Sequence, residues 1–135
     1  MWNDLFSSVN LLGKGASASW LRNEVISNNI ANVDTPGFKE SEVKFEDLMA
    51  AAMGQQGTLA MNTTDERHMS TQGGDVDQVE PHIVTDTDTS AGLDDNNVDI
   101  ETEMSEMAKN SIEYYTLVSK VNSEFRKLDA AINVT

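Results

Sequence analysis

The side chains best suited to acid–base catalysis are two histidines, His68 and His82. Neither stands beside a nucleophile elbow, a cluster of metal ligands or a glycine-rich phosphate loop, the patterns that give histidine a catalytic role. The sequence contains no cysteine, which excludes thiol nucleophiles, disulfides and thiolate metal sites. We therefore predict that the chain is not an enzyme and uses no cofactor, and we interpret both histidines as polar loop residues.

An acidic run offers the best candidate for a metal site, because calcium prefers several oxygen ligands at alternating loop positions. Its carboxylates belong to Asp86, Asp88, Asp94 and Asp95. Counting from Asp86, however, places Ala91 where the turn glycine belongs and Asn97 where the bidentate glutamate belongs. We favour a solvated acidic loop and keep a calcium-responsive binding module as an alternative function.

Three asparagines precede a Pro-Gly turn: Asn28, Asn29 and Asn32. Asparagine is an indifferent helix former, yet the spacing of four places Asn28 and Asn32 on one helix face. Their amides could satisfy the terminal carbonyls of a helix, or they could bond across a helix interface and fix its register. The residue types alone leave both roles open.

The clearest structural pattern lies at the C-terminal end, where the spacing of apolar residues alternates between four and three. Such heptads are typical of a coiled coil, and they predict a helix over about 99–132 with Asn97 or Asp99 as its cap. Ser111 is the polar interruption of the seam. The seam residues are Ile100, Met104, Met107, Ser111, Tyr114, Val118, Val121, Phe125, Leu128 and Ile132.

The N-terminal segment offers a partner helix with the same alternation. Its seam is Leu5, Val9, Leu12, Ala16, Ser19, Asn23, Ile26, Ile30 and Val33. Gly13 and Gly15 each cost about 1 kcal/mol inside a helix, so we expect a firm helix only over about 16–33. Pro36 ends it, and Thr35-Pro36-Gly37-Phe38 is typical of a turn with glycine at its third position.

The predicted fold is mainly α, with long terminal helices that pair as a coiled coil. Three segments follow from this: an N-terminal helical segment (1–38), a polar and acidic insert (39–96) and a C-terminal heptad helix (97–135). Within the insert, which we expect to be mostly irregular, we predict a short helix at 45–53 and weak strands at 76–79 and 82–84.

Composition narrows the classes of partner. The chain has 135 residues and a formal net charge of −14, which disfavours nucleic acid and anionic lipid surfaces as partners. Only 6% of its residues are aromatic, so a thick core is not expected. We find neither a run of about 20 apolar residues that could span a bilayer nor a basic and apolar signal sequence.

Two stretches carry a resemblance to a known family. Residues 27–39 (SNNIANVDTPGFK) resemble the N-terminal signature of the bacterial flagellar axial proteins, which include the rod, hook and hook-associated components. Residues 96–104 (NNVDIETEM) and 121–128 (VNSEFRKL) resemble the C-terminal region of B-type proximal-rod proteins, and 64–69 (TDERHM) a segment of their middle. The C-type proximal-rod proteins are the nearest alternative, whereas distal-rod and hook proteins carry larger inserts.

The resemblance implies a noncatalytic subunit of the flagellar basal-body rod. Such a subunit would leave the cell through the flagellar type III apparatus without signal cleavage and reside in the periplasmic rod. Its partners would be other rod proteins, copies of itself, and the membrane-ring, export-gate and rod-adaptor components at the rod base. The matching residues form an expected assembly motif of Asn28, Asn29, Ile30, Asn32, Thr35, Pro36 and Gly37.

Overall fold

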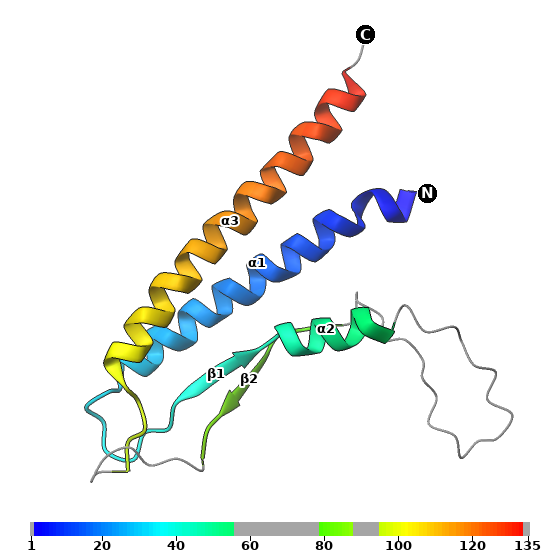
Figure 1. The fold of residues 1–135 in the computed structure, drawn as a ribbon. Helices are drawn as coiled ribbons and strands as arrows, with labels where there is room; N and C mark the ends of the chain where they lie inside the picture. The colour runs from blue at the N-terminus through cyan, green and yellow to red at the C-terminus, as the bar shows by residue number, and fades with distance from the viewer. Residues whose placement is uncertain (1, 56–78, 88–94, 134–135) are drawn as a thin grey trace, which may run out of the picture.

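A computed structural model describes residues 2–55, 79–87 and 95–133 of the chain (Figure 1). Its elements follow in the order α1 (Trp2–Ala31), β1 (Ser41–Lys44), α2 (Glu46–Gln55), β2 (His82–Thr85) and α3 (Ile100–Ile132). The prediction of a mainly α chain with long terminal helices and minor β structure is confirmed. In the part that is described, no helix is long and apolar enough to cross a membrane.

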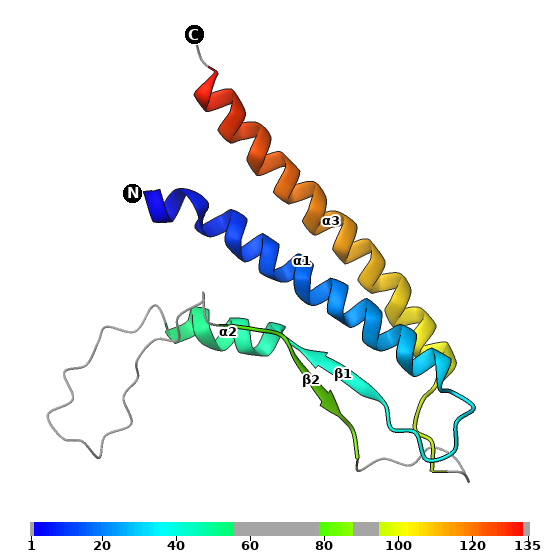
Figure 2. The same cartoon turned by 180° about the vertical axis from the view of Figure 1, so that it is seen from behind.

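The two long helices form an antiparallel pair. They lie closest where α1 ends and α3 begins, and they spread apart toward the chain termini (Figures 1 and 2). Contacts of Asn29 with Glu103 and of Ser19 with Asn110 show the antiparallel direction. This arrangement is consistent with the coiled-coil pairing that the heptads predict.

Helix α3 begins where the sequence predicted. Asp99 is its N-cap, and the side-chain carboxylate accepts hydrogen bonds from the backbone N–H groups of Glu101 (2.9 Å) and Thr102 (3.4 Å). These bonds satisfy amides that have no partner within the helix. Asn97, the other candidate cap, has a different role described below.

Helix α1 is longer at its N-terminal end than predicted. It runs without interruption through Gly13 and Gly15 and ends at Ala31, so the expected range of 16–33 is wrong at both ends. Tertiary contacts offset the glycine penalty. A β-carbon on Gly15 would meet Leu117 Cδ1 of α3 at 3.4 Å, so this glycine lies where the two helices approach closely.

A small hairpin layer covers the side of α1 opposite α3 (Figure 1). Strands β1 and β2 pair antiparallel, with Ser41 opposite Thr85 and Lys44 opposite His82. Helix α2 continues from β1 and corresponds to the predicted helix at 45–53. The core lies between this layer and α1, and consists of Ala18, Phe45 and Met49 with Leu11 and Val79 packed against them.

The connection between α1 and β1 is the predicted turn. Phe38 N donates to Thr35 O at 3.2 Å, and Gly37 has a φ of 73°. A glycine adopts this left-handed conformation without the steric penalty of a β-carbon. The turn reverses the chain so that β1 lies alongside the end of the helix it has just left.

Candidate assembly site

Asn29 is the central residue of the predicted motif and is 1% exposed. Its side-chain Oδ1 accepts from Ser41 N (3.1 Å), and its Nδ2 donates to Ser41 O (2.9 Å). The same Nδ2 also donates to Glu103 Oε2 at 3.2 Å. One side-chain amide therefore joins α1, β1 and α3, pairing with the strand backbone as a neighbouring strand would.

Asn96, just before α3, caps the end of α1 from outside. Its Nδ2 lies 2.9 Å from the backbone carbonyl oxygens of Asn32, Val33 and Thr35. Its Oδ1 accepts from Val98 N at 2.8 Å. Carbonyl groups at a helix C-terminus lack partners within the helix, and this buried amide supplies a donor for those that follow α1.

Asn97 joins the start of α3 to the hairpin. Its Oδ1 accepts from Glu40 N at 2.7 Å, and its Nδ2 donates to Asp86 O at 3.3 Å. The backbone of Asp86 also donates to Glu40 O at 2.9 Å, which extends the β1–β2 ladder by one bond. We call Asn29, Asn96 and Asn97 the asparagine clasp, because together they join the ends of both long helices and the hairpin.

The remaining asparagines of the motif act locally. Asn32 Nδ2 donates to Asn28 O (2.8 Å) and lies 3.2 Å from Asn28 Oδ1, while Thr35 Oγ1 donates to Asn32 Oδ1 (3.3 Å). Asn28 is exposed. Both roles left open by the sequence are therefore present: Asn32 bonds backbone at the helix end, and Asn29 bonds across the interface.

The rest of the motif lies around the clasp. Ile30 is half-buried, whereas Thr35, Pro36 and Gly37 are exposed on the turn. The buried Ile26 precedes them on α1. Its burial places this part of α1 in the interior of the described fold, whereas the turn is accessible to a neighbouring molecule.

Two carboxyl groups meet beside the clasp. Glu103 on α3 is 4% exposed and faces Glu40, the residue before β1. Burial raises the pKa of Glu40 to about 7, and charge repulsion from Glu103 and a hydrogen bond between the two carboxyl groups raise it further in the same direction. Both residues line a cavity of about 160 Å³ between α1, β1 and α3.

The face of α3 that meets α1 is rotated from the predicted seam. It consists of buried and half-buried residues at alternating spacings of four and three: Glu103, Met107, Asn110, Tyr114, Leu117, Val121, Glu124 and Leu128. Asn110 Nδ2 donates to Ser19 O at 2.8 Å, and the ring centroid of Tyr114 lies 6.2 Å from that of Trp20. Four predicted seam residues, Met107, Tyr114, Val121 and Leu128, belong to this face.

Other predicted seam residues lie outside this contact face. Val118 is half-buried, and four residues are exposed: Ile100, Met104, Phe125 and Ile132. Phe125 is 53% exposed and Ile132 is 81% exposed. Their role in packing against another helix stays a prediction, because α1 does not cover them in the single chain.

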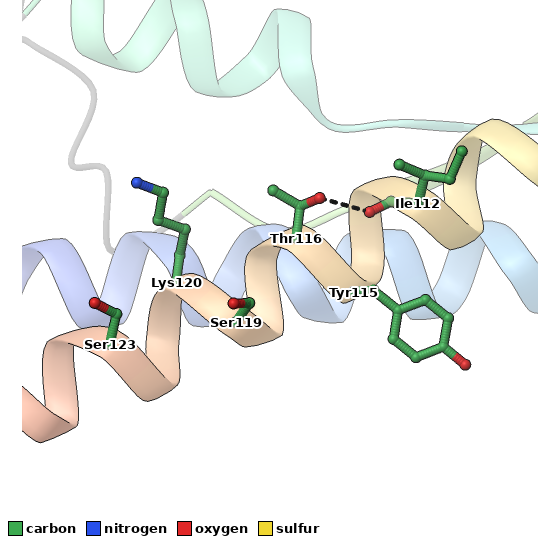
Figure 3. A pocket seen from close by; sticks show the side chains of 6 residues that line it. All are labelled: Ile112, Tyr115, Thr116, Ser119, Lys120 and Ser123. Carbon is green, nitrogen blue, oxygen red and sulfur yellow. Dashed lines mark hydrogen bonds between the residues drawn. The ribbon is translucent and has the colours of Figure 1, made fainter.

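A groove follows the outer surface of α3 (Figure 3). Ile112 and Tyr115 lie along it together with the small polar residues Thr116, Ser119 and Ser123 and with Lys120. Tyr115 is 72% exposed. Large apolar and aromatic side chains exposed beside small ones give a surface that a neighbouring helix can pack against.

Several residues of the site were not predicted as such. Glu103 was interpreted as a favourable charge near the helix N-terminus, and Glu40 was not singled out. Asn110 was passed over as well, although it is buried against α1. The one available signal was the spacing of seven between Glu103, Asn110 and Leu117, which marks a single helix face.

The acidic run is only partly described. Asp86 takes part in the hairpin bonds given above, and Asp95 adopts a φ of 62° just before the clasp. Asp88 and Asp94 lie outside the described residues, as does His68, while His82 is exposed on β2. Among the residues that can be placed, no group of three or more His, Cys, Asp or Glu side chains could hold a metal ion.

Comparison with known proteins gives the family. The family described as "Flagella basal body rod protein" matches residues 12–39, which span the second half of α1 and the asparagine turn. The chain is 36% identical over 129 residues to the flagellar basal body rod protein FlgB of Bacillus subtilis, covering 95% of each chain. It is 38% identical over 111 residues to FlgB of Aeromonas hydrophila, covering 82% of this chain and 81% of the relative.

A more distant relative covers almost the whole chain. FlgB of Aquifex aeolicus is 31% identical over 129 residues, which are 96% of this chain and 95% of the relative. These alignments include both long helices and the asparagine clasp between them. The chain therefore belongs to the family of the flagellar basal body rod protein FlgB.

Proposed function

We propose that the chain is a structural subunit of the proximal rod of the flagellar basal body, and that it helps to form the shaft that transmits torque. The observation that carries this proposal is the incomplete cover of α3. Ile112, Tyr115 and Phe125 are exposed on a helix whose contact face with α1 lies elsewhere. Long helices gain most of their stability from packing an apolar face, so these residues favour further helices as partners.

The terminal segments 1–38 and 97–135 are the assembling part in this proposal, and 39–96 is an insert between them. The seven-residue motif that includes Asn29 and the Pro-Gly turn sets the relative position of the two helices. Side chains at the spreading ends of α1 and α3 become fully packed only next to neighbouring subunits. Many helices packed side by side would resist twisting, which is the mechanical requirement of a drive shaft.

The partners proposed are other rod proteins, further copies of this chain, and membrane-ring, export-gate and rod-adaptor components at the base of the rod. We further propose that the flagellar type III apparatus exports the subunit to the periplasmic rod without removing a signal. The FlgB relatives support the basal body as its location. The high negative charge argues against nucleic acid and lipid as partners.

A pair of substitutions separates assembly from folding. Phe125→Asp places a charge on the exposed side of α3, so it should change the free energy of unfolding of the isolated chain by no more than about 0.5 kcal/mol. Val121→Asp places the same charge on the face that meets α1, where it should also destabilise the isolated chain. We expect both variants to be absent from purified basal bodies and to abolish swimming.

The matched control is Asn122→Asp, which adds the same charge at an exposed position between them. It should leave incorporation and swimming unchanged. Normal motility of cells that carry Phe125→Asp or Val121→Asp would contradict the assignment of these helix faces to assembly.

A further inference from the structure

The carboxyl pair beside the asparagine clasp has no role in the packing of apolar faces. Glu103 is almost fully buried on α3, and Glu40 approaches it from the start of β1 with a hydrogen bond between the two carboxyl groups. Two carboxylates at this distance repel each other when both are ionised, and burial makes each charge more costly. A hydrogen bond between them requires that one of them carries a proton.

The surrounding groups do not neutralise the pair. Arg22, the basic residue that lines the cavity, bonds to Glu46 at 2.6 Å and lies 3.6 Å from Glu113. Lys44 on β1 pairs with Glu42 at 2.6 Å, and Lys109 on α3 pairs with Glu106 at 2.6 Å. The remaining charges near Glu40 come from Glu42 on β1 and Asp86 after β2, and both disfavour its ionised form.

Asn29 selects which carboxyl group keeps its charge. Its Nδ2 donates to Glu103 Oε2, and a donor at 3.2 Å stabilises a carboxylate more than a neutral acid. Glu40 is half-buried and its side chain receives no such donor from Asn29, whose Oδ1 and Nδ2 bond the backbone of Ser41. The geometry therefore assigns the proton to Glu40 and the negative charge to Glu103.

We propose that Glu40 and Glu103 share one proton and form a pH-sensitive latch that holds the β1–β2 hairpin against α3. The latch is closed when the proton is present and is released as the pair loses it. Both carboxyl groups are then ionised, and their repulsion loosens the hairpin from the helix pair. This inference concerns the single subunit and does not depend on the proposed function.

The direction of the effect follows from linkage. Because the pKa of Glu40 is raised in the folded chain, from 4.5 to about 7, the folded state holds the proton longer than the unfolded state as pH rises. The stabilisation is fully present below about pH 4.5 and is lost as pH rises to about 7. Most other carboxylates are already ionised above pH 6, so the range from about pH 6 to pH 8 isolates the latch.

The test is urea unfolding of the full-length chain, followed by circular dichroism between about pH 6 and pH 8. Both histidines also titrate in this range, so every protein carries His68→Gln and His82→Gln. The parent should show a urea midpoint that falls as pH rises and levels off near pH 8. Glu40→Gln should show no fall, because an amide can donate to Glu103 at every pH, and its midpoint should exceed that of the parent at pH 8.

Glu24→Gln is the matched control, since Glu24 is exposed on α1 and should leave the fall in midpoint unchanged. A parent chain whose helical signal and urea midpoint are constant over this range, whether folded or unfolded, would overturn the latch. The same conclusion would follow if Glu40→Gln fell as steeply as the parent. A rise in midpoint on adding calcium at pH 8 that Glu40→Gln abolishes would show that a cation occupies the pair, and would also overturn the shared proton.

Discussion

Replacing Asn29 by alanine is the sharpest perturbation of the asparagine clasp. The substitution removes three hydrogen bonds: one accepted from Ser41 N, one donated to Ser41 O and one donated to Glu103 Oε2. A buried polar group left without a partner costs about 1–3 kcal/mol, and more when it is charged. Ser41 is half-buried and can recruit water, which reduces its share, whereas Glu103 is 4% exposed.

Together these losses should lower the free energy of unfolding by about 2–4 kcal/mol. With a urea dependence of about 1–3 kcal/mol per molar, the midpoint should shift by more than about 1 M. Asn29→Asp keeps an acceptor for Ser41 N but places a second carboxylate against Glu103, so it should be destabilising as well. The measurement is urea unfolding of the full-length variants, followed by circular dichroism.

The control for this prediction is Asn28→Ala. Asn28 is exposed, and its side chain accepts a single bond from Asn32 at 3.2 Å, so its loss should cost no more than about 0.5 kcal/mol. Equal midpoints for the Asn29→Ala and Asn28→Ala variants would refute the clasp as the element that joins the two helices and the hairpin.

Two further predictions use the same unfolding assay. Gly13→Ala should raise the free energy of unfolding by about 0.5–1 kcal/mol, because its β-carbon would have no heavy atom within 4 Å, and Gly37→Ala should lower it by about 1 kcal/mol, because φ there is +73°; opposite signs would contradict these backbone conformations. Burial raises the pKa of Glu46, but its hydrogen bond from Arg22 outweighs burial and lowers that pKa below 4.5. Arg22→Met should therefore cost about 0.5–1 kcal/mol near pH 7 and progressively less as pH falls below about 4.5, and a cost that does not change with pH would refute the ion pair.

The sequence predicts the long helices because their determinants are local. The heptads and the cap at Asp99 place the start of α3 within one residue of where it lies. The start of α1 was not predictable in this way, because the penalty at Gly15 is offset by Leu117, about a hundred residues away in the chain. Strand β1 was missed because Ser-Glu-Val-Lys contains one apolar residue, Val43, which is buried against α1.

The candidate site was predictable in its location but not in its bonding. Asn28 and Asn29 are the same residue type in adjacent positions, and only the direction of each side chain separates the exposed one from the buried one. Glu103 is 74 positions away from Asn29, so no local pattern connects them. The heptads predicted a single seam on α3, whereas α1 covers about half of those residues and leaves Phe125 and Ile132 exposed.

The central claim is that this chain is a structural part of the flagellar rod. Quantitative mass spectrometry of basal bodies purified from the source cell tests it most directly. The account predicts that the chain is present in an amount comparable to the other rod components and stays with them through washing. Basal bodies that retain the rest of the rod but lack this chain would contradict it.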